Sequence, residues 1–343
     1  MKRIALLVLG ISLFIGGASA QVVYNFKSKS VNQDSIKVGN AFVRHDILNH
    51  LNIGINLGSS GVGIEVQSSI TKYVGVRAGI DYMPRFNSAI DFGLQAYKGD
   101  GSFNTDLDRM QEFMKTLTGY EVDQEVSIIG QPTMLNFKFL VDIYPWADKP
   151  WHVTAGFYCG SAKIATAVNS IVEMPTLLAV GIYNQFYDKS MSDYFIDNPI
   201  FGNNYLSPDV VMQLRDRMES MGRMGIHMGD YEIYDENGKR TLFLYMMEPG
   251  DDGLVKADVF VNKFKPYVGI GYNGFLPKNK KIKIGFDLGV MMWGGTPKVI
   301  THDGVDLARD VINVKGRVGD YVDVISAFKV YPVLNFKISY NIF

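Results

Sequence analysis

The sequence has 343 residues but only one cysteine, Cys159, so an intramolecular disulfide framework is excluded. Acidic and basic residues nearly cancel, with a formal net charge of −1, and this argues against a nucleic-acid partner, which needs a basic surface. No GxSxG, HExxH, P-loop or CxxC motif occurs. The few histidines lack the spacing of metal ligands: His45, His50, His152, His227 and His302. The sequence therefore predicts no cofactor, no metal site and no catalytic residue.

After the first residues, the chain also lacks an apolar run that approaches the roughly 18 residues of a membrane helix. The beginning itself is typical of a secretory signal peptide: Lys2-Arg3, an apolar run over residues 4–15, and Ala18-Ser19-Ala20 as a cleavage site. We therefore expect a signal peptide over residues 1–20 and a periplasmic segment over residues 21–50; an uncleaved amino-terminal anchor is the alternative. An exported chain without a helical anchor is either soluble or a β-barrel.

What the sequence does contain is alternation with a period of two. In residues 334–343 the apolar side chains alternate with polar ones, which gives a β-strand one apolar face, facing lipid, and one polar face. The residues of this apolar face are Leu334, Phe336, Ile338, Tyr340 and Ile342. Seven further segments alternate in the same way: 51–58, 62–67, 74–82, 135–143, 152–157, 268–272 and 282–290. Bacterial single-chain barrels have an even number of strands, so the pattern predicts an all-β fold, an eight-stranded antiparallel transmembrane β-barrel over residues 51–343.

The connections between these strands support a membrane topology. Every second connection is short, and three of the four others are long: 85–132, 161–264 and 295–329. Outer-membrane barrels have short periplasmic turns and long outer loops, so we expect both termini in the periplasm. A soluble β-sandwich, whose strands also alternate, is one alternative. Another is a ten-stranded barrel, if residues 231–247 also enter the membrane.

The long loops carry secondary-structure signals of their own. Apolar residues of 107–117 share one helical face and precede Gly119, and Ser207-Pro208 is typical of a helix start. Asn237-Gly238, between apolar runs, predicts a β-hairpin within residues 231–245. We therefore predict short helices and a hairpin in a folded outer cap. The nine methionines of residues 161–264 would form its core or, alternatively, a Met- and Tyr-rich binding surface.

The polar faces of the strands carry four acids and four bases. Eight strands enclose an interior about wide enough for side chains to fill, and an unpaired ion buried there costs several kcal/mol. We therefore predict a lumen charge network that plugs the barrel, with a gated ion path as the alternative. Its members are Glu65, Arg77, Asp81, Lys138, Asp142, Lys283, Asp287 and Lys337. Aromatic residues near the strand ends predict interfacial girdles: Tyr73, Tyr144, Trp146 and Trp151 at one end, and Tyr82, Phe86 and Tyr331 at the other.

Several strands resemble those of a known family. Residues 74–79, 266–272, 286–290 and 331–336 are similar to signature strands of small outer-membrane β-barrel proteins, of the porin-like or outer-membrane-protein-A transmembrane-domain type found in Gram-negative gut anaerobes. The resemblance implies a location in the cell outer membrane, with membrane lipid and the barrel assembly machinery as partners. It covers the strands and not the loops.

We therefore predict a non-enzymatic barrel with a plugged lumen and a structural or surface-interaction role, in which the loops contact an unknown extracellular partner. Porin-like or gated transport of small solutes is the alternative. A third hypothesis, an outer-membrane enzyme, depends on His302-Asp303 alone, and Asp303-Gly304 is more typical of a turn. Residues 235–238 and 251–252 could also be proposed as calcium ligands, but turns use the same residue types.

Overall fold

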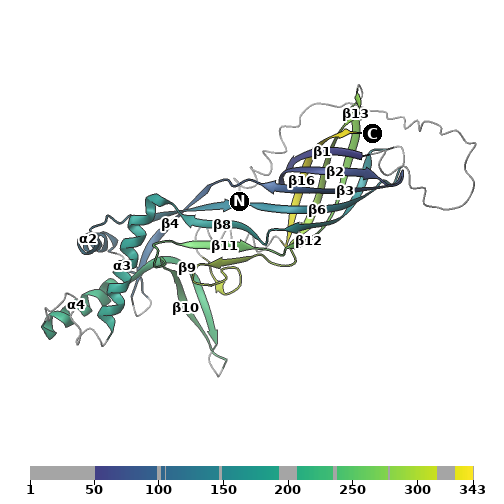
Figure 1. Ribbon diagram of the computed structural model, residues 1–343. Helices are drawn as coiled ribbons and strands as arrows, with labels where there is room; N and C mark the ends of the chain where they lie inside the picture. Colours follow the sequence, from purple (N-terminus) through teal and green to yellow (C-terminus); the bar gives the residue numbers. More distant parts are fainter. Residues whose placement is uncertain are drawn as a thin grey trace, which may run out of the picture.

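The structure is a computed structural model, and it describes residues 51–98, 102–104, 106–146, 149–192, 207–234, 238–276, 279–314 and 329–342. The predicted signal peptide and the segment 21–50 lie outside these residues. The described chain forms a closed β-barrel at one end and a cap of one open sheet with helices at the other (Figure 1).

The barrel has eight antiparallel strands in the order β1-β16-β13-β12-β7-β6-β3-β2. Their bounds are β1 (Leu51–Gly58), β2 (Gly61–Ser69), β3 (Val74–Met83), β6 (Met134–Ile143), β7 (Trp151–Gly160), β12 (Phe264–Leu276), β13 (Asn279–Met292) and β16 (Val330–Asn341). All eight segments predicted from alternation become barrel strands, which confirms the predicted fold class. The first strand pairs with the last, with Ile55 opposite Ile338, so the barrel has no free edge.

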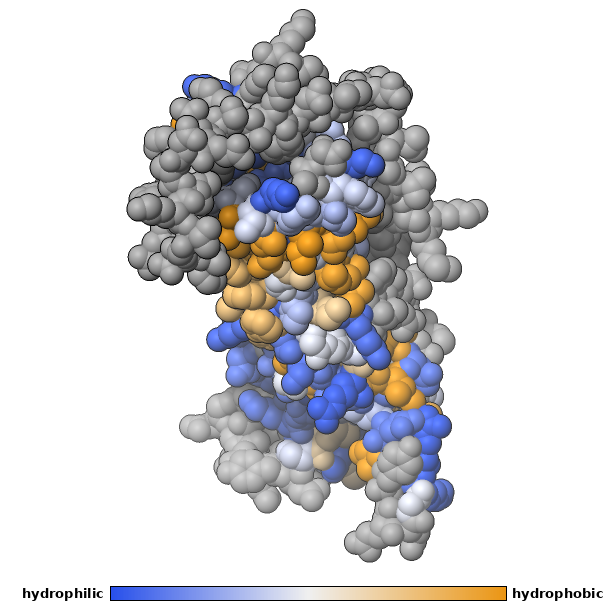
Figure 2. Space-filling view, turned by 90° about the vertical axis from the view of Figure 1, so that its right-hand side faces the viewer, coloured by the Kyte–Doolittle hydropathy of each residue, from blue (hydrophilic) through white to orange (hydrophobic). Residues whose placement is uncertain are grey.

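The outer surface of the barrel is apolar. Along β1 the burial alternates strictly, with Asn52 and Asn56 buried inside and Ile55 61% exposed outside. On β16 the predicted lipid face, including Phe336, Ile338 and Tyr340, points outward as expected. Figure 2 shows an orange belt of hydrophobic residues across the molecule, with blue hydrophilic residues below it. A soluble β-sandwich would bury such residues between two sheets, so the closed barrel with its exposed apolar belt rules that alternative out.

The cap sheet continues one side of the barrel wall. Its order is β10-β9-β4-β5-β8-β11-β14, and β15 pairs with β9. The strands are β4 (Ser88–Tyr97), β5 (Glu125–Pro132), β8 (Lys163–Asn169), β9 (Arg223–Tyr234), β10 (Arg240–Met247), β11 (Lys256–Phe260), β14 (Lys298–Thr301) and β15 (Val311–Ile312). The barrel neighbours β3-β6-β7-β12-β13 recur here as β4-β5-β8-β11-β14, because one to five residues of chain join each barrel strand to its cap strand.

This continuation was not predicted from the sequence, and it corrects one alternative. The hairpin predicted within residues 231–245 is formed by β9 and β10, although residues 235–237 of its turn lie outside the described chain. Both strands belong to the cap sheet and not to the barrel. The ten-stranded alternative is therefore wrong.

Three helices and one short 3₁₀ turn, η3 (Ile171–Glu173), complete the described cap. The predicted helices are α2 (Leu107–Thr118) and α4 (Pro208–Met221), the latter begun by Ser207, whose hydroxyl accepts a hydrogen bond from the Val210 amide. The longest helix, α3 (Met174–Met191), was not predicted, because it is apolar on several sides and lacks a single stripe. None of the described helices has the length and apolar character needed to cross a membrane.

Methionine is a main component of the core of the cap. Met110 and Met114 of α2 and Met218 of α4 are almost fully buried, together with Leu177 and Tyr183 of α3. Most of the methionines of residues 161–264 are buried in the same way, although Met212 is exposed. These methionines therefore stabilise the cap as part of its core, which was the first of the two hypotheses for them.

Candidate functional site

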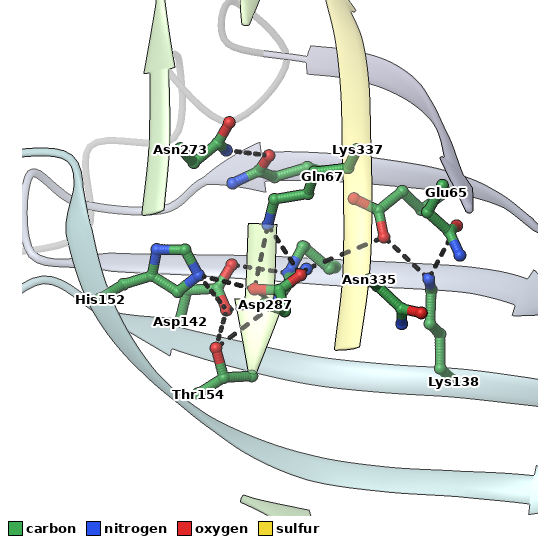
Figure 3. Close-up of polar contacts among 12 residues, drawn as sticks. Glu65, Gln67, Lys138, Asp142, His152, Thr154, Asn273, Asp287, Asn335 and Lys337 are labelled. Carbon is green, nitrogen blue, oxygen red and sulfur yellow. Dashed lines mark hydrogen bonds and ion pairs between the residues drawn. The ribbon is translucent and has the colours of Figure 1, made fainter. Parts of the chain in front are cut away.

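The lumen is the most highly charged interior of the molecule, and its side chains come from strands all around the barrel (Figure 3). Seven of the eight predicted charges meet there in direct ion pairs: Glu65, Arg77, Asp81, Lys138, Asp142, Asp287 and Lys337. They point inward because each lies on the polar face of its strand, where alternate residues face the lumen. We call this group the lumen charge network.

Arg77 on β3 lies at the centre of the network. Its Nε is 2.7 Å from Asp142 Oδ2, and its Nη2 donates a hydrogen bond of 2.8 Å to Asp142 Oδ1. On the other side its Nη1 donates to Asp287 Oδ2 at 2.7 Å, while Glu65 is 3.8 Å away. Asp287 belongs to β13, four strands from β3 in either direction around the barrel. The guanidinium therefore bridges opposite walls of the lumen, in the paired geometry that makes Arg–carboxylate contacts strong.

A second group of ions lies around Lys138 on β6. Its Nζ is 2.9 Å from Glu65 Oε2 and 2.9 Å from Asp81 Oδ1. The same ammonium donates a hydrogen bond to Asn56 Oδ1, and the Ser60 hydroxyl donates to Asp81 Oδ2. Because Glu65 contacts both Lys138 and Arg77, the two groups form one connected network.

Asp287 has two further partners: Lys337, which was predicted for the network, and His152, which was not. Lys337 Nζ lies 3.1 Å from its Oδ2, and His152 Nε2 lies 3.1 Å from its Oδ1. His152 is also 3.8 Å from Asp142, to which the Thr154 hydroxyl donates a hydrogen bond of 2.7 Å. His152 and Thr154 occupy the polar parity of β7, so parity alone was a signal that could have found them.

The eighth predicted residue, Lys283, lies apart from the network. It forms no ion pair with a described residue, and its Nζ lies 4.7 Å from the centre of the Phe275 ring. Lys265 is an inward lysine that sequence reasoning missed, because it precedes the predicted strand 268–272. It is fully buried and donates to Asn136 Oδ1 and to the carbonyl of Ser161.

Glycines on the polar parity leave the space that the network occupies. A Cβ at Gly63 would lie 2.1 Å from Asp81 Oδ1, and one at Gly271 would lie 2.4 Å from Asp287 Oδ1. Real side chains cannot approach so closely. The abundance of glycine among the polar partners of these strands is therefore a packing requirement of the charged lumen.

A second, apolar layer lies at the cap-side end of the lumen. Tyr158, Tyr267 and Met291 point inward there, and the two tyrosine rings contact edge to face with centroids 5.4 Å apart. Trp293 stacks on Tyr331 at 5.2 Å, and the Tyr331 hydroxyl donates to the carbonyl of Ser59. This aromatic layer was not predicted from the sequence.

Two residues predicted for the aromatic girdles therefore lie elsewhere. Tyr331 belongs to the mouth of the lumen, and Tyr144 faces inward, with its ring 5.2 Å from His152 and its hydroxyl accepting a hydrogen bond from Gln67. Other predicted girdle residues are exposed at the barrel surface, among them Trp146 and Trp151.

The loop residues proposed for other chemistry have structural partners. The Tyr245 hydroxyl donates to the carboxylate of Asp303 at 2.8 Å, and Thr301 also contacts that carboxylate. Burial and the adjacent Asp303 raise the pKa of Tyr245 well above its usual value. Asp252 pairs with Lys256 at 2.7 Å. Among the residues that the structure describes, no group of three or more His, Cys, Asp or Glu side chains could hold a metal ion.

Comparison with known proteins gives limited similarity. No protein-family model matches the sequence, and no curated protein matches it. Among solved structures, CarO2 of Acinetobacter baumannii is 12% identical, with 85% of this chain and 98% of that chain covered and a TM-score of 0.35. CarO of the same organism is 13% identical, with 85% and 97% covered and a TM-score of 0.32. A major outer membrane protein from Thermus thermophilus is 12% identical, with 84% and 96% covered and a TM-score of 0.26.

Proposed function

We propose that this chain is an outer-membrane β-barrel with a closed lumen, whose function is to hold a folded cap outside the membrane for contact with an extracellular partner. In this proposal both termini lie in the periplasm, the barrel assembly machinery inserts the chain, and the barrel itself catalyses no reaction. The closed barrel and its apolar belt support the membrane location, because only a barrel without edges satisfies all strand hydrogen bonds in lipid.

The observation that carries the closed lumen is the set of contacts across its diameter. Arg77 on β3 reaches Asp287 on β13, and Asn273 on β12 donates to Gln67 Oε1 on β2 at 2.9 Å. In the strand order each pair is four strands apart, which is the greatest separation that eight strands allow. Contacts across the full diameter support a lumen that side chains fill, as an eight-stranded barrel allows.

The observation that supports the display of a cap is its attachment to the barrel. Five neighbouring barrel strands continue into the cap sheet, so the two parts are joined through β-structure over more than one half of the wall. The helix α3 is fixed to that sheet, because Asn184 exchanges two hydrogen bonds with the backbone of Met224 and the Tyr183 hydroxyl donates to the carbonyl of Gly222. Such a cap presents a defined surface and not a flexible loop.

Conductance in planar lipid bilayers tests the closed lumen. We expect the purified chain to give no large, steady open state. A large open state would reject the plugged lumen and favour the alternative, porin-like or gated transport of small solutes.

Protease treatment of intact cells, followed by mass spectrometry, tests the orientation. We expect cleavage only within residues 85–132, 161–264 and 295–329. Cleavage at residues 147–149 or 277–280 would place the opposite end of the barrel outside the cell.

A further inference from the structure

Lysines gather on one quadrant of the barrel, at the boundary between the barrel and the cap. Lys263 precedes β12, Lys298 begins β14 and Lys329 precedes β16. Backbone hydrogen bonds place these segments side by side: the Asn262 amide donates to the carbonyl of Trp293, and the Trp293 amide donates to the carbonyl of Lys329. Lys298 pairs with Phe260 on the neighbouring β11, three residues before Lys263. We call Lys263, Lys298 and Lys329 the lysine rim.

The lysine rim has positive charge that the described protein does not neutralise. All three side chains are exposed, and none forms an ion pair with a residue in the described part of the chain. Two acids on neighbouring segments have other partners: Asp258 pairs with Lys163 at 3.3 Å, and Asp306 accepts a hydrogen bond from the Val299 amide. Cap lysines differ in this respect, since Lys115 pairs with Glu121 and Lys256 with Asp252.

The lysine rim also borders the lipid-facing belt directly. Phe264, the residue after Lys263, is 55% exposed, and its ring lies 5.1 Å from that of Phe157 on the same outer surface. Val330, the residue after Lys329, is exposed as well. A lysine in this position lays its methylenes along apolar surface and holds its ammonium at the level of the headgroups.

We propose that the lysine rim binds a membrane lipid of the cap-side leaflet whose headgroup carries more than one phosphate. Three ammonium groups on adjacent segments match several negative charges better than a single one, and lysine binds phosphate as a point charge. A lipid fits better than a dissolved anion, because Phe264 and Val330, the residues that follow Lys263 and Lys329, are exposed apolar side chains that would contact the acyl chains.

The test compares lipid retention by matched variants of the full chain. Each protein is placed in nanodiscs of phosphatidylcholine that contain a small fraction of cardiolipin, a lipid with two phosphates, and the retained cardiolipin is measured by native mass spectrometry. The rim variant carries Lys263→Gln, Lys298→Gln and Lys329→Gln. The charge-matched control carries Lys115→Gln, Lys189→Gln and Lys256→Gln, which remove three charges from the cap.

A lysine near an anionic membrane surface contributes about fivefold in affinity, so the rim variant is expected to bind cardiolipin about a hundredfold more weakly at low salt. The control is expected to bind as the wild type does, and a third variant with Arg at the three rim positions is expected to retain binding. Undiminished retention by the rim variant, or an equal loss in the control, would overturn the proposal. Binding of inorganic phosphate by the wild type in pure phosphatidylcholine nanodiscs, if abolished in the rim variant, would instead assign the site to a dissolved anion. None of these outcomes depends on whether the lumen conducts.

Discussion

Replacing the central arginine is the most direct test of the lumen charge network. Arg77 is almost fully buried and contacts three carboxylates: Asp142 and Asp287 at 2.7 Å and Glu65 at 3.8 Å. The variant Arg77→Met keeps an unbranched side chain but leaves these acids with fewer cations. Breaking a buried ion pair by removing one partner costs about 3–5 kcal/mol, so we expect a loss of that size in the free energy of unfolding.

The assay is urea unfolding of the reconstituted barrel, followed by tryptophan fluorescence. Lys115→Met serves as the matched control, because Lys115 and Glu121 also form a close pair, at 2.6 Å, but their side chains are 58% and 81% exposed. Exposed pairs contribute about 0–1 kcal/mol. If Arg77→Met destabilises the barrel no more than Lys115→Met does, the network does not stabilise the lumen and our reasoning fails.

A double variant separates charge imbalance from lost packing. Arg77→Met with Asp142→Leu removes one cation and the carboxylate that pairs with it at 2.7 Å, so the lumen keeps the net charge of the wild type and Asp287 keeps its pair with Lys337. Replacing both members of a buried pair by apolar residues is often close to neutral, and we therefore expect the double variant to recover about 2 kcal/mol relative to Arg77→Met alone. If the loss in the double variant equals the sum of the losses in the two single variants, the two side chains do not interact.

Three further variants test other parts of the structure. Gly63→Ala places a methyl group 2.1 Å from a lumen carboxylate oxygen, and we expect the resulting overpacking to cost about 1–3 kcal/mol in the same urea assay, unlike Ala at the open position Gly93. Trp293→Ala removes the ring stacked on Tyr331, and we expect a loss of about 3–5 kcal/mol, seen as a lower unfolding midpoint; an unchanged midpoint would show that the aromatic layer is not a stabilising core. Arg223→Ala breaks the pair with Glu248, whose hydrogen bond raises the pKa of Arg223 above its usual value, and we expect faster proteolysis of the cap at an unchanged barrel unfolding midpoint.

The barrel could be predicted because the apolar and polar residues alternate within each strand and so show which side chains face lipid and which face the lumen. Residues 334–343 face lipid on one parity and the lumen on the other, and this pattern is readable without knowing any neighbouring strand. The predicted helices α2 and α4 were found for a similar local reason, since each has an apolar stripe and a recognisable start or end.

The cap sheet could not be predicted in the same way, because its strands lack a clean alternation. In β5, Ile128 and Ile129 are adjacent, and β8 contains small residues such as Ala165 and Ala167 that give little contrast between its faces. The sheet becomes evident only when these segments are seen to continue β6 and β7. The strand pairing, not the local pattern, defines them.

The sequence by itself determined the number of barrel strands, the lipid-facing residues and most of the inward charges, because strand parity is a local property of the chain. Only the tertiary structure decided which charges meet. Arg77 and Asp287 are 210 positions apart, and their contact depends on closure of the barrel and the stagger of its strands. The alternation within a strand gives no information about contacts between strands. For this reason Lys283 was predicted as a member of the network and His152 was not, although both lie on the polar face of their strands.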